Sequence, residues 1–176
     1  TSFPPGDGYG ALADLLERVL GTAWRFRRVS VPKELWHAGA GSGDGERINL
    51  IAERWGRTES ERCSLYFHTD TVPAGAGWQR PPFTLTRDGS RLYGRGTADM
   101  KGTIAAAFAA LRAAERLGVK LRFDPVMLFC TDEEGGLYPG IRYLAEEKLL
   151  VGHLLNFNGG AVPRAWAGCF GSVDVA

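Results

Sequence analysis

The spacing of apolar residues predicts helices in three parts of the chain. Over 9–20 they recur at positions three and four apart, and Gly21 marks the end of that helix. Over 100–117 the chain is rich in alanine, with its larger apolar side chains on one face and Gly118 at its end. A further amphipathic pattern covers 138–150. We therefore expect three helices, each with one face against a core.

Between these helices lie shorter segments with the patterns of strands. They are 24–31, 48–55, 64–68, 125–130 and 154–157. The run 125–130 is apolar throughout, which predicts a strand covered on both faces, and 154–157 is predicted to be another buried strand. Asp88-Gly89 indicates a hairpin turn between 83–86 and 91–93. Strands that alternate with helices predict an α/β domain with a largely parallel sheet.

Length, charge and cysteine content narrow the class of protein. The 176 residues suffice for one domain, and 21 Lys and Arg against 20 Asp and Glu leave a net charge of +1. That balance argues against a nucleic-acid-binding protein and against a polybasic membrane anchor. Cys63, Cys130 and Cys169 are far apart and odd in number, which predicts free buried thiols in a reducing compartment. Residues 1–6 lack the features of a secretory signal, so we expect a cytoplasmic protein.

Polar side chains gather where three of the predicted strands end. His68 and Asp70 follow one strand, the acidic residues 132–134 follow the next, and Asn156 and Asn158 end the last. In open α/β sheets, ligands bind beyond the carboxyl ends of the strands. The sequence therefore predicts a site at this edge of the sheet.

Each of these polar segments has a structural and a chemical interpretation. His68 can be a strand-end histidine beside a solvated Asp70, or a metal ligand whose other ring nitrogen donates to that carboxylate. Asp99 opens a helix after a Gly-rich stretch, where it can cap the helix or bridge two cations. The acidic run 132–134 can be a solvated turn, or a cluster that a cation neutralises. Histidine and carboxylates at one edge are a ligand set for zinc and related divalent ions.

Three segments carry a resemblance to a known family: YFHTDTVP at 66–73, LYGRGTADMKG at 92–102 and FCTDEEGG at 129–136. In order and spacing they resemble the N-terminal signatures of the dinuclear zinc aminoacylase and carboxypeptidase family, which includes acetylornithine deacetylase, succinyl-diaminopimelate desuccinylase and glutamate carboxypeptidases. The resemblance covers nearly the whole chain. It implies a three-layer α/β sandwich with a mixed, mostly parallel sheet. The activity it implies is hydrolysis of an amide bond in an N-acyl amino acid or small peptide.

The resemblance also implies a role for each matched residue. His68 binds the first metal and Asp70 orients it, while Asp99 bridges both metals and is followed by a cis peptide bond. Glu133 is the general base, which takes a proton from water and passes it to the leaving nitrogen. Glu134 binds the second metal. The implied cofactor is one or two zinc ions, with cobalt or manganese as alternatives.

Two departures from the family pattern set the expectation for this chain. The carboxylate that completes the first metal falls at Asn158, a candidate ligand whose neutral amide oxygen is weaker. The family's second-metal histidine and its lid or dimerisation domain lie beyond the matched segments, and His37 and His153 are both disfavoured as ligands. We therefore expect 1–176 to be the N-terminal portion of a metallohydrolase catalytic domain, without the lid and the C-terminal catalytic segment.

Three states of such a chain remain open. In order of preference, it is an incomplete catalytic half, a degenerate binding module without activity, or a mononuclear hydrolase in its own right. The expected partners are a small N-acyl amino acid or peptide substrate and a second chain or further copy that completes the fold. Neither nucleic acid nor a membrane is expected among them.

Overall fold

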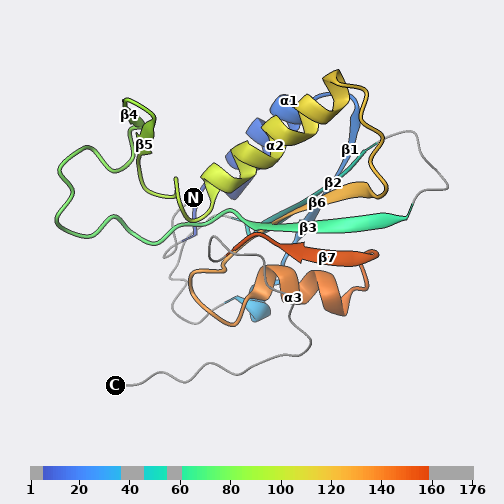
Figure 1. The fold of residues 1–176 in the computed structure, drawn as a ribbon. Coiled ribbons are helices and arrows are strands. Elements are labelled where there is room, and N and C mark those ends of the chain that lie inside the picture. The colour runs from blue at the N-terminus through green and yellow to red at the C-terminus, as the bar shows by residue number, and fades with distance from the viewer. Residues whose placement is uncertain (1–5, 37–45, 55–60, 159–176) are drawn as a thin grey trace.

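The computed structural model describes residues 6–36, 46–54 and 61–158. Helices lie at Tyr9–Leu20 (α1), Lys101–Arg116 (α2) and Pro139–Glu146 (α3), with a short 3-10 helix at Lys33–Leu35. Strands lie at Trp24–Ser30 (β1), Ile48–Arg54 (β2), Arg62–His68 (β3), Thr86–Asp88 (β4), Arg91–Tyr93 (β5), Asp124–Cys130 (β6) and His153–Asn156 (β7). The predicted turn at Asp88-Gly89 joins β4 to β5. This hairpin projects away from the main body (Figure 1).

The main sheet has the strand order β1-β2-β6-β3-β7. β3 pairs in parallel with both β6 and β7, whereas β2 pairs antiparallel with β1 and with β6. Within this sheet β2 alone therefore runs against the other strands. The predicted mixed and mostly parallel sheet is confirmed.

Helices cover both faces of the sheet, which makes the three layers that were predicted. α1 and α2 lie on one face and α3 on the other (Figure 1). Side chains of α1 and α2 pack with Phe67 and Phe129 in one buried cluster. The neighbouring residues Tyr66 and Leu128 point to the opposite face and pack with Leu144 of α3. Strand β6 is buried along its whole length, as the apolar run predicts.

The predicted end of the third helix is wrong. α3 ends at Glu146 and not at 150. Lys148 adopts a left-handed conformation with φ of 55°, and the amide of Leu149 bonds back to the carbonyl of Leu144 at 2.9 Å. Leu149 still packs against the core on the α3 face, so the apolar spacing continues although the helix has stopped.

The predicted burial of the last strand is also wrong. Leu154 and Leu155 of β7 are 47% and 49% exposed. β7 is the outermost strand of the described sheet and pairs there with β3 alone. An apolar run shows that a strand can be covered, but it carries no information on what covers it.

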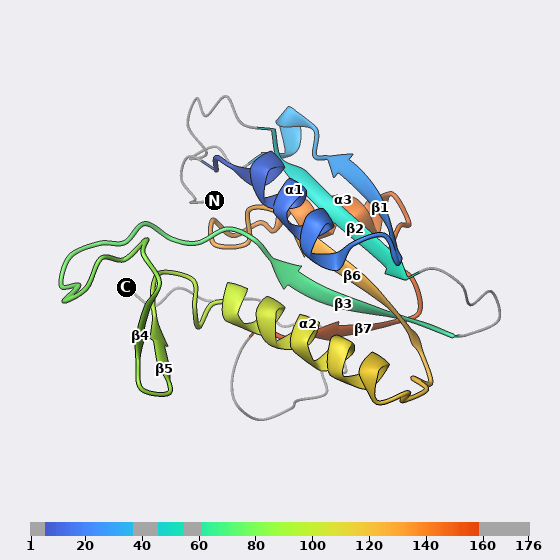
Figure 2. The ribbon, with the colours of Figure 1, turned by 90° about the horizontal axis from the view of Figure 1, so that it is seen from above.

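The carboxyl ends of β3, β6 and β7 lie side by side in the sheet. In the parallel register His68 lies opposite Cys130, and Tyr66 lies opposite Asn156. The residues that follow β3, β6 and β7 therefore meet at one edge. The first turn of α2 begins beside the same edge (Figure 2).

Two smaller expectations can be checked in the described residues. Cys63 and Cys130 are free and buried, as predicted, and Cys169 lies outside the described ranges. None of the helices in the described part of the chain is long and apolar enough to cross a membrane.

Candidate metal centre

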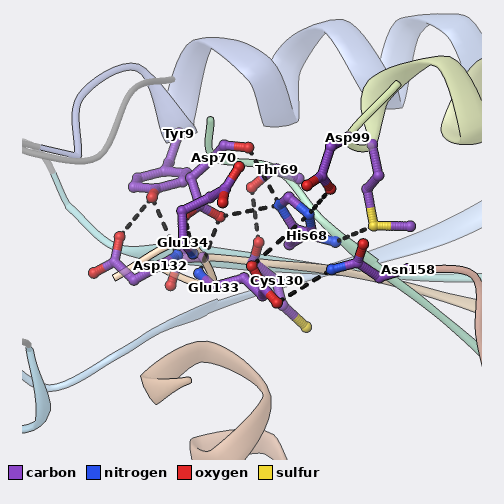
Figure 3. Close-up of polar contacts among 12 residues, drawn as sticks. Tyr9, His68, Thr69, Asp70, Asp99, Cys130, Asp132, Glu133, Glu134 and Asn158 are labelled. Carbon is purple, nitrogen blue, oxygen red and sulfur yellow. Dashed lines mark hydrogen bonds and ion pairs between the residues drawn. The ribbon is translucent and has the colours of Figure 1, made fainter. Parts of the chain in front are cut away.

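His68, Asp99 and Glu134 come from separate elements and meet at the edge of the sheet (Figure 3). His68 ends β3, Asp99 lies just before α2, and Glu134 follows β6. Each offers one ligand atom, and these atoms all lie within 4.8 Å of one another. One imidazole nitrogen and two carboxylate oxygens so placed fit a zinc-like divalent ion. The His68 side chain is fully buried and that of Asp99 is 56% exposed, so the group lies between the core and solvent.

His68 is held through both of its ring nitrogens. Nε2 lies 2.8 Å from Oδ1 of Asp99. Nδ1 lies 3.2 Å from the backbone carbonyl of Asp70 and 3.5 Å from its carboxylate. The structure thus brings Asp70 beside His68, as the predicted orienting role requires. The peptide bond between Asp99 and Met100 is cis, as the resemblance implied.

Asp70 also holds the acidic turn after β6, a contact that sequence reasoning missed. Its two carboxylate oxygens accept the backbone N–H groups of Glu133 at 3.1 Å and Glu134 at 2.9 Å. Burial alone would raise the pKa of Asp70, but the hydrogen bonds with His68 and with these two amides lower it below its usual value. Asp70 is therefore a charged, buried link between the ends of β3 and β6.

Glu133 lies next to the ligand group. Its Oε2 is 4.0 Å from Nε2 of His68, and its Oε1 accepts a hydrogen bond from the side-chain nitrogen of Asn158 at 3.1 Å (Figure 3). The backbone amide of Asn158 donates to the side chain of Asn156 at 2.8 Å. The structure thus places Asn158 beside Glu133, and its assignment as a metal ligand stays a prediction.

Burial and the neighbouring carboxylates shift the pKa values of Glu133, Glu134 and His68. Burial raises the pKa of Glu133 and of Glu134, and the neighbouring carboxylate of Asp99 raises both further. Burial would lower the pKa of His68, but its hydrogen bonds with Asp70 and Asp99 outweigh this and raise the pKa to about 9. For Glu133 and Glu134 burial is the largest cause, and an excess of negative charge among the neighbouring carboxylates adds to it. A divalent cation would neutralise that excess.

A pocket of about 310 Å³ opens beside the ligand group. Asp99 and Glu134 line it together with Trp78, Tyr93 and Arg95. A larger hollow of about 420 Å³ lies beside Arg80 but reaches none of the candidate ligands. The smaller pocket is the better candidate for a substrate site, because a substrate has to contact the reacting groups.

The structure decides between several of the alternative interpretations. Asp99 does not cap α2, since the cap position is Met100 and has no side-chain capping bond. The acidic turn is not simply solvated, because Asp132 is fully buried and the Glu133 side chain is 20% exposed. His153 lies at the start of β7 with its ring edge-on to Phe123, away from the ligand group. His37 lies outside the described residues.

Residues to which sequence reasoning assigned no role bind the segment that precedes Glu133. Tyr9 and Arg47 bind Asp132, and Asn49 bonds both to the amide of Thr131 and to the carbonyl of Gly140. All of these contacts join residues more than 80 positions apart. No spacing or periodicity signals such contacts.

Residues 64–167 match the sequence profile of peptidase family M20/M25/M40. The chain belongs to this family. Its relatives include a succinyl-diaminopimelate desuccinylase from Rhodospirillum rubrum, 41% identical over 155 residues, which are 82% of this chain and 36% of that protein. An acetylornithine deacetylase from Salmonella arizonae is 45% identical over 84 residues, 47% of this chain and 21% of that protein. The predicted family is confirmed.

Solved structures of M20 enzymes share the fold. Human carnosine dipeptidase 1 matches with a TM-score of 0.64 and 24% identity, over 84% of this chain and 31% of that chain. An M20 family metallo-carboxypeptidase from Sulfolobus solfataricus matches with a TM-score of 0.62 and 22% identity, over 86% of this chain and 32% of that chain. In all four of these comparisons the chain spans at most 36% of the relative's length.

Proposed function

We propose that this M20 chain takes part in the metal-dependent hydrolysis of an amide bond in an N-acyl amino acid or small peptide. The observation that carries the proposal is the convergence of His68, Asp99 and Glu134 within 4.8 Å at the carboxyl ends of the strands. Desuccinylase and deacetylase relatives support the type of bond, and dipeptidase and carboxypeptidase neighbours share the fold.

In this proposal each residue has a defined role. His68, Asp99 and Glu134 hold one or two zinc ions, or cobalt or manganese in their place, and Asn158 is a further candidate ligand. Bound zinc would polarise the substrate carbonyl and lower the pKa of water. Asp70 fixes the orientation of His68 and holds the amides of the acidic turn.

Glu133 is the proposed general base. Its Oε2 lies 4.0 Å from Nε2 of His68, next to the ligand group at which we propose that substrate and water meet. Burial raises its pKa toward the range in which a carboxylate both accepts and returns a proton. It takes a proton from the attacking water and delivers it to the leaving nitrogen. The hydrogen bond from Asn158 holds one of its oxygens, which leaves the other to face His68.

We further propose that residues 1–176 are the N-terminal portion of the catalytic domain, and that a second chain or another copy completes the active site. The support is the share of the relatives that the chain spans, 36% for the desuccinylase. The second candidate is a binding module of the same fold without activity. The observation that favours it is the neutral Asn158 beside Glu133, because an amide adds no negative charge for a cation.

Metal analysis and two matched variants test the proposal. Wild-type protein should retain zinc after dialysis, and His68→Ala should lose it. Glu134→Gln should lose metal, whereas Glu133→Gln should keep most of it and lose about 10²–10⁴-fold in activity in the native assembly. Glu146→Gln, on the exposed face of α3, is the control and should change neither the metal content nor the activity.

Several outcomes would contradict parts of the proposal. If wild-type protein binds no zinc, and His68→Ala changes neither metal content nor melting temperature in added zinc, the assignment of a metal site to His68, Asp99 and Glu134 is wrong. Equal metal loss in Glu133→Gln and Glu134→Gln, with activity restored by excess zinc, would reverse their roles. The isolated chain should give background rates with N-acetyl and N-succinyl amino acids. A monodisperse monomer whose activity depends on Glu133 would refute the proposal that this chain is an incomplete catalytic half.

A further inference from the structure

We propose that Tyr9, Arg47 and Asp132 form a buried clamp that positions Glu133. Loss of the clamp should therefore lower the rate of turnover much more than it lowers the affinity for metal. The inference rests on the proposed function, in which Glu133 is the general base. Tyr9, Arg47 and Asp132 are positioning residues, because they act on the reaction only through the turn that carries Glu133. We call these three residues the clamp.

Asp132 is the centre of the clamp and is held at three points. Its Oδ2 accepts a hydrogen bond from Nε of Arg47 at 2.9 Å, and its Oδ1 accepts one from the hydroxyl of Tyr9 at 2.5 Å. Its backbone N–H donates to the same hydroxyl oxygen at 3.2 Å (Figure 3 shows the contacts with Tyr9). All three clamp residues are at most 3% exposed. The chain is therefore fixed one residue before Glu133.

Arg47 is in turn held by residues outside the clamp. Its Nη1 donates to the backbone carbonyl of Gly6 at 3.1 Å, and its guanidinium carbon lies 4.3 Å from the centre of the Trp36 ring. Tyr9 is the first residue of α1, and Arg47 directly precedes β2. The clamp thus ties the acidic turn to rigid parts of the N-terminal region.

The backbone of the turn shows why it needs to be held. Asp132 has a φ of 53°, in the left-handed region that most residues avoid. In this conformation the amides of Glu133 and Glu134 donate to the carboxylate of Asp70. The clamp holds Asp132, and Asp70 holds the backbone amides of Glu133 and Glu134. A shift of Asp132 would therefore pass directly to Glu133, the next residue along the chain.

Stability alone is a weak reason for such a group. A buried ion pair can often be replaced by packed apolar residues of similar volume without loss of stability. A general base, in contrast, has to lie within hydrogen-bond reach of the proton that it takes, and a misplacement of about 1 Å can cost about 10²-fold in rate. The ion pair of Arg47 and Asp132 lies next to Glu133, a residue for which such accuracy matters.

Two clamp variants and two controls test the inference. Tyr9→Phe removes only the hydroxyl, and Asp132→Asn keeps the shape of the side chain. Tyr143→Phe removes a tyrosine hydroxyl from α3 and is the chemical control. Leu16→Ala truncates the core on the α1 and α2 face of the sheet and is the control for lost stability.

The first readout is backbone hydrogen exchange, measured by NMR at the amides of Glu133 and Glu134. Both clamp variants should raise these exchange rates by about 10-fold or more relative to the amides of β6, because the turn opens locally. The second readout is kinetic, in the zinc-loaded native assembly. Tyr9→Phe and Asp132→Asn should lower kcat by about 10–10²-fold, with KM and zinc content nearly unchanged. Tyr143→Phe should change neither readout, and Leu16→Ala should lower only the melting temperature.

Each outcome decides the inference. Unchanged exchange at Glu133 in both clamp variants would overturn it, whatever their activity. Leu16→Ala is compared with a clamp variant that has the same fall in melting temperature. If both lose kcat equally, the clamp has only a structural role and the inference is overturned. Should Asp132→Asn fail to fold, Tyr9→Phe decides. If the wild-type assembly hydrolyses no substrate, the proposed function fails, while the exchange rates still show whether the clamp holds the turn.

Discussion

Asp70→Asn is expected to weaken both the fold around the acidic turn and its affinity for zinc. The carboxylate of Asp70 is fully buried and accepts one backbone N–H on each oxygen, from Glu133 at 3.1 Å and from Glu134 at 2.9 Å. The amide of Asn has a single acceptor oxygen, so one of these hydrogen bonds becomes a contact between two donors. Losing a charge-assisted bond costs about 1.5–3 kcal/mol, and a buried unpaired N–H costs about 1–3 kcal/mol.

These two costs overlap, since they describe the same lost contact, and we expect a net destabilisation of about 2–4 kcal/mol. The zinc affinity should fall as well, because Asp70 orients His68 and holds the amide of Glu134. Loss of a group that orients metal ligands typically costs about 10–100-fold in affinity. The dissociation constant for zinc should rise by the same factor.

Urea unfolding and zinc titration against a chromophoric chelator measure the two effects. Asp88→Asn is the matched control, because it makes the same substitution in an exposed ion pair with Arg80. It should shift the free energy of unfolding by less than about 1 kcal/mol. If Asp70→Asn shifts stability no more than Asp88→Asn does and leaves zinc affinity unchanged, the role given to Asp70 is refuted.

Three further predictions follow from the packing. Gly140→Ala should lower stability by about 1–3 kcal/mol in calorimetry, because a Cβ there would lie 2.5 Å from the carbonyl oxygen of Thr131; an unchanged melting temperature would contradict this close approach. Leu144→Ala should cost about 2–5 kcal/mol in urea unfolding, since Leu144 is fully buried on the α3 face; a cost of about 0.5 kcal/mol, the scale of a surface substitution, would show that α3 is loosely packed. Cys63 and Cys130 should react slowly with a thiol reagent until the protein unfolds, because burial raises the pKa of both thiols; rapid labelling of either of these two cysteines in the native protein, located by peptide mapping, would contradict their burial.

The elements could be predicted because their signals are local. The apolar spacing over 9–20 reflects one helix face and needs no knowledge of the rest of the chain. The meeting of His68 with the acidic turn could also be predicted, because parallel strands end at one edge of a sheet. The exposure of β7 could not, because burial depends on what covers a strand and not on the strand's own residues.

The support behind the site could not be predicted for the same reason. Tyr9 is 123 residues from Asp132, and Arg47 is 85 residues from it. Neither stands in a motif, and a tyrosine in a helix or an arginine before a strand is ordinary. Only the folded chain shows that both reach the residue next to Glu133. Asp70 was assigned to His68 from its spacing, but its bonds to the turn depend on how β3 and β6 lie together.

The 2.8 Å contact between His68 and Asp99 closes a long excursion of the chain. Between these residues the backbone leaves the sheet, forms the β4–β5 hairpin and returns to α2 (Figure 2). Because β3 and α2 pin both ends, a change in the length of this arm alters mainly its closure entropy, by about 0.6 kcal/mol for each doubling. Insertions and deletions in the β4–β5 hairpin of this arm, away from Asp70, should therefore leave the ligand geometry intact. The arm also lines the pocket beside Asp99, so evolution can reshape the pocket wall there without rebuilding the residues that hold the metal.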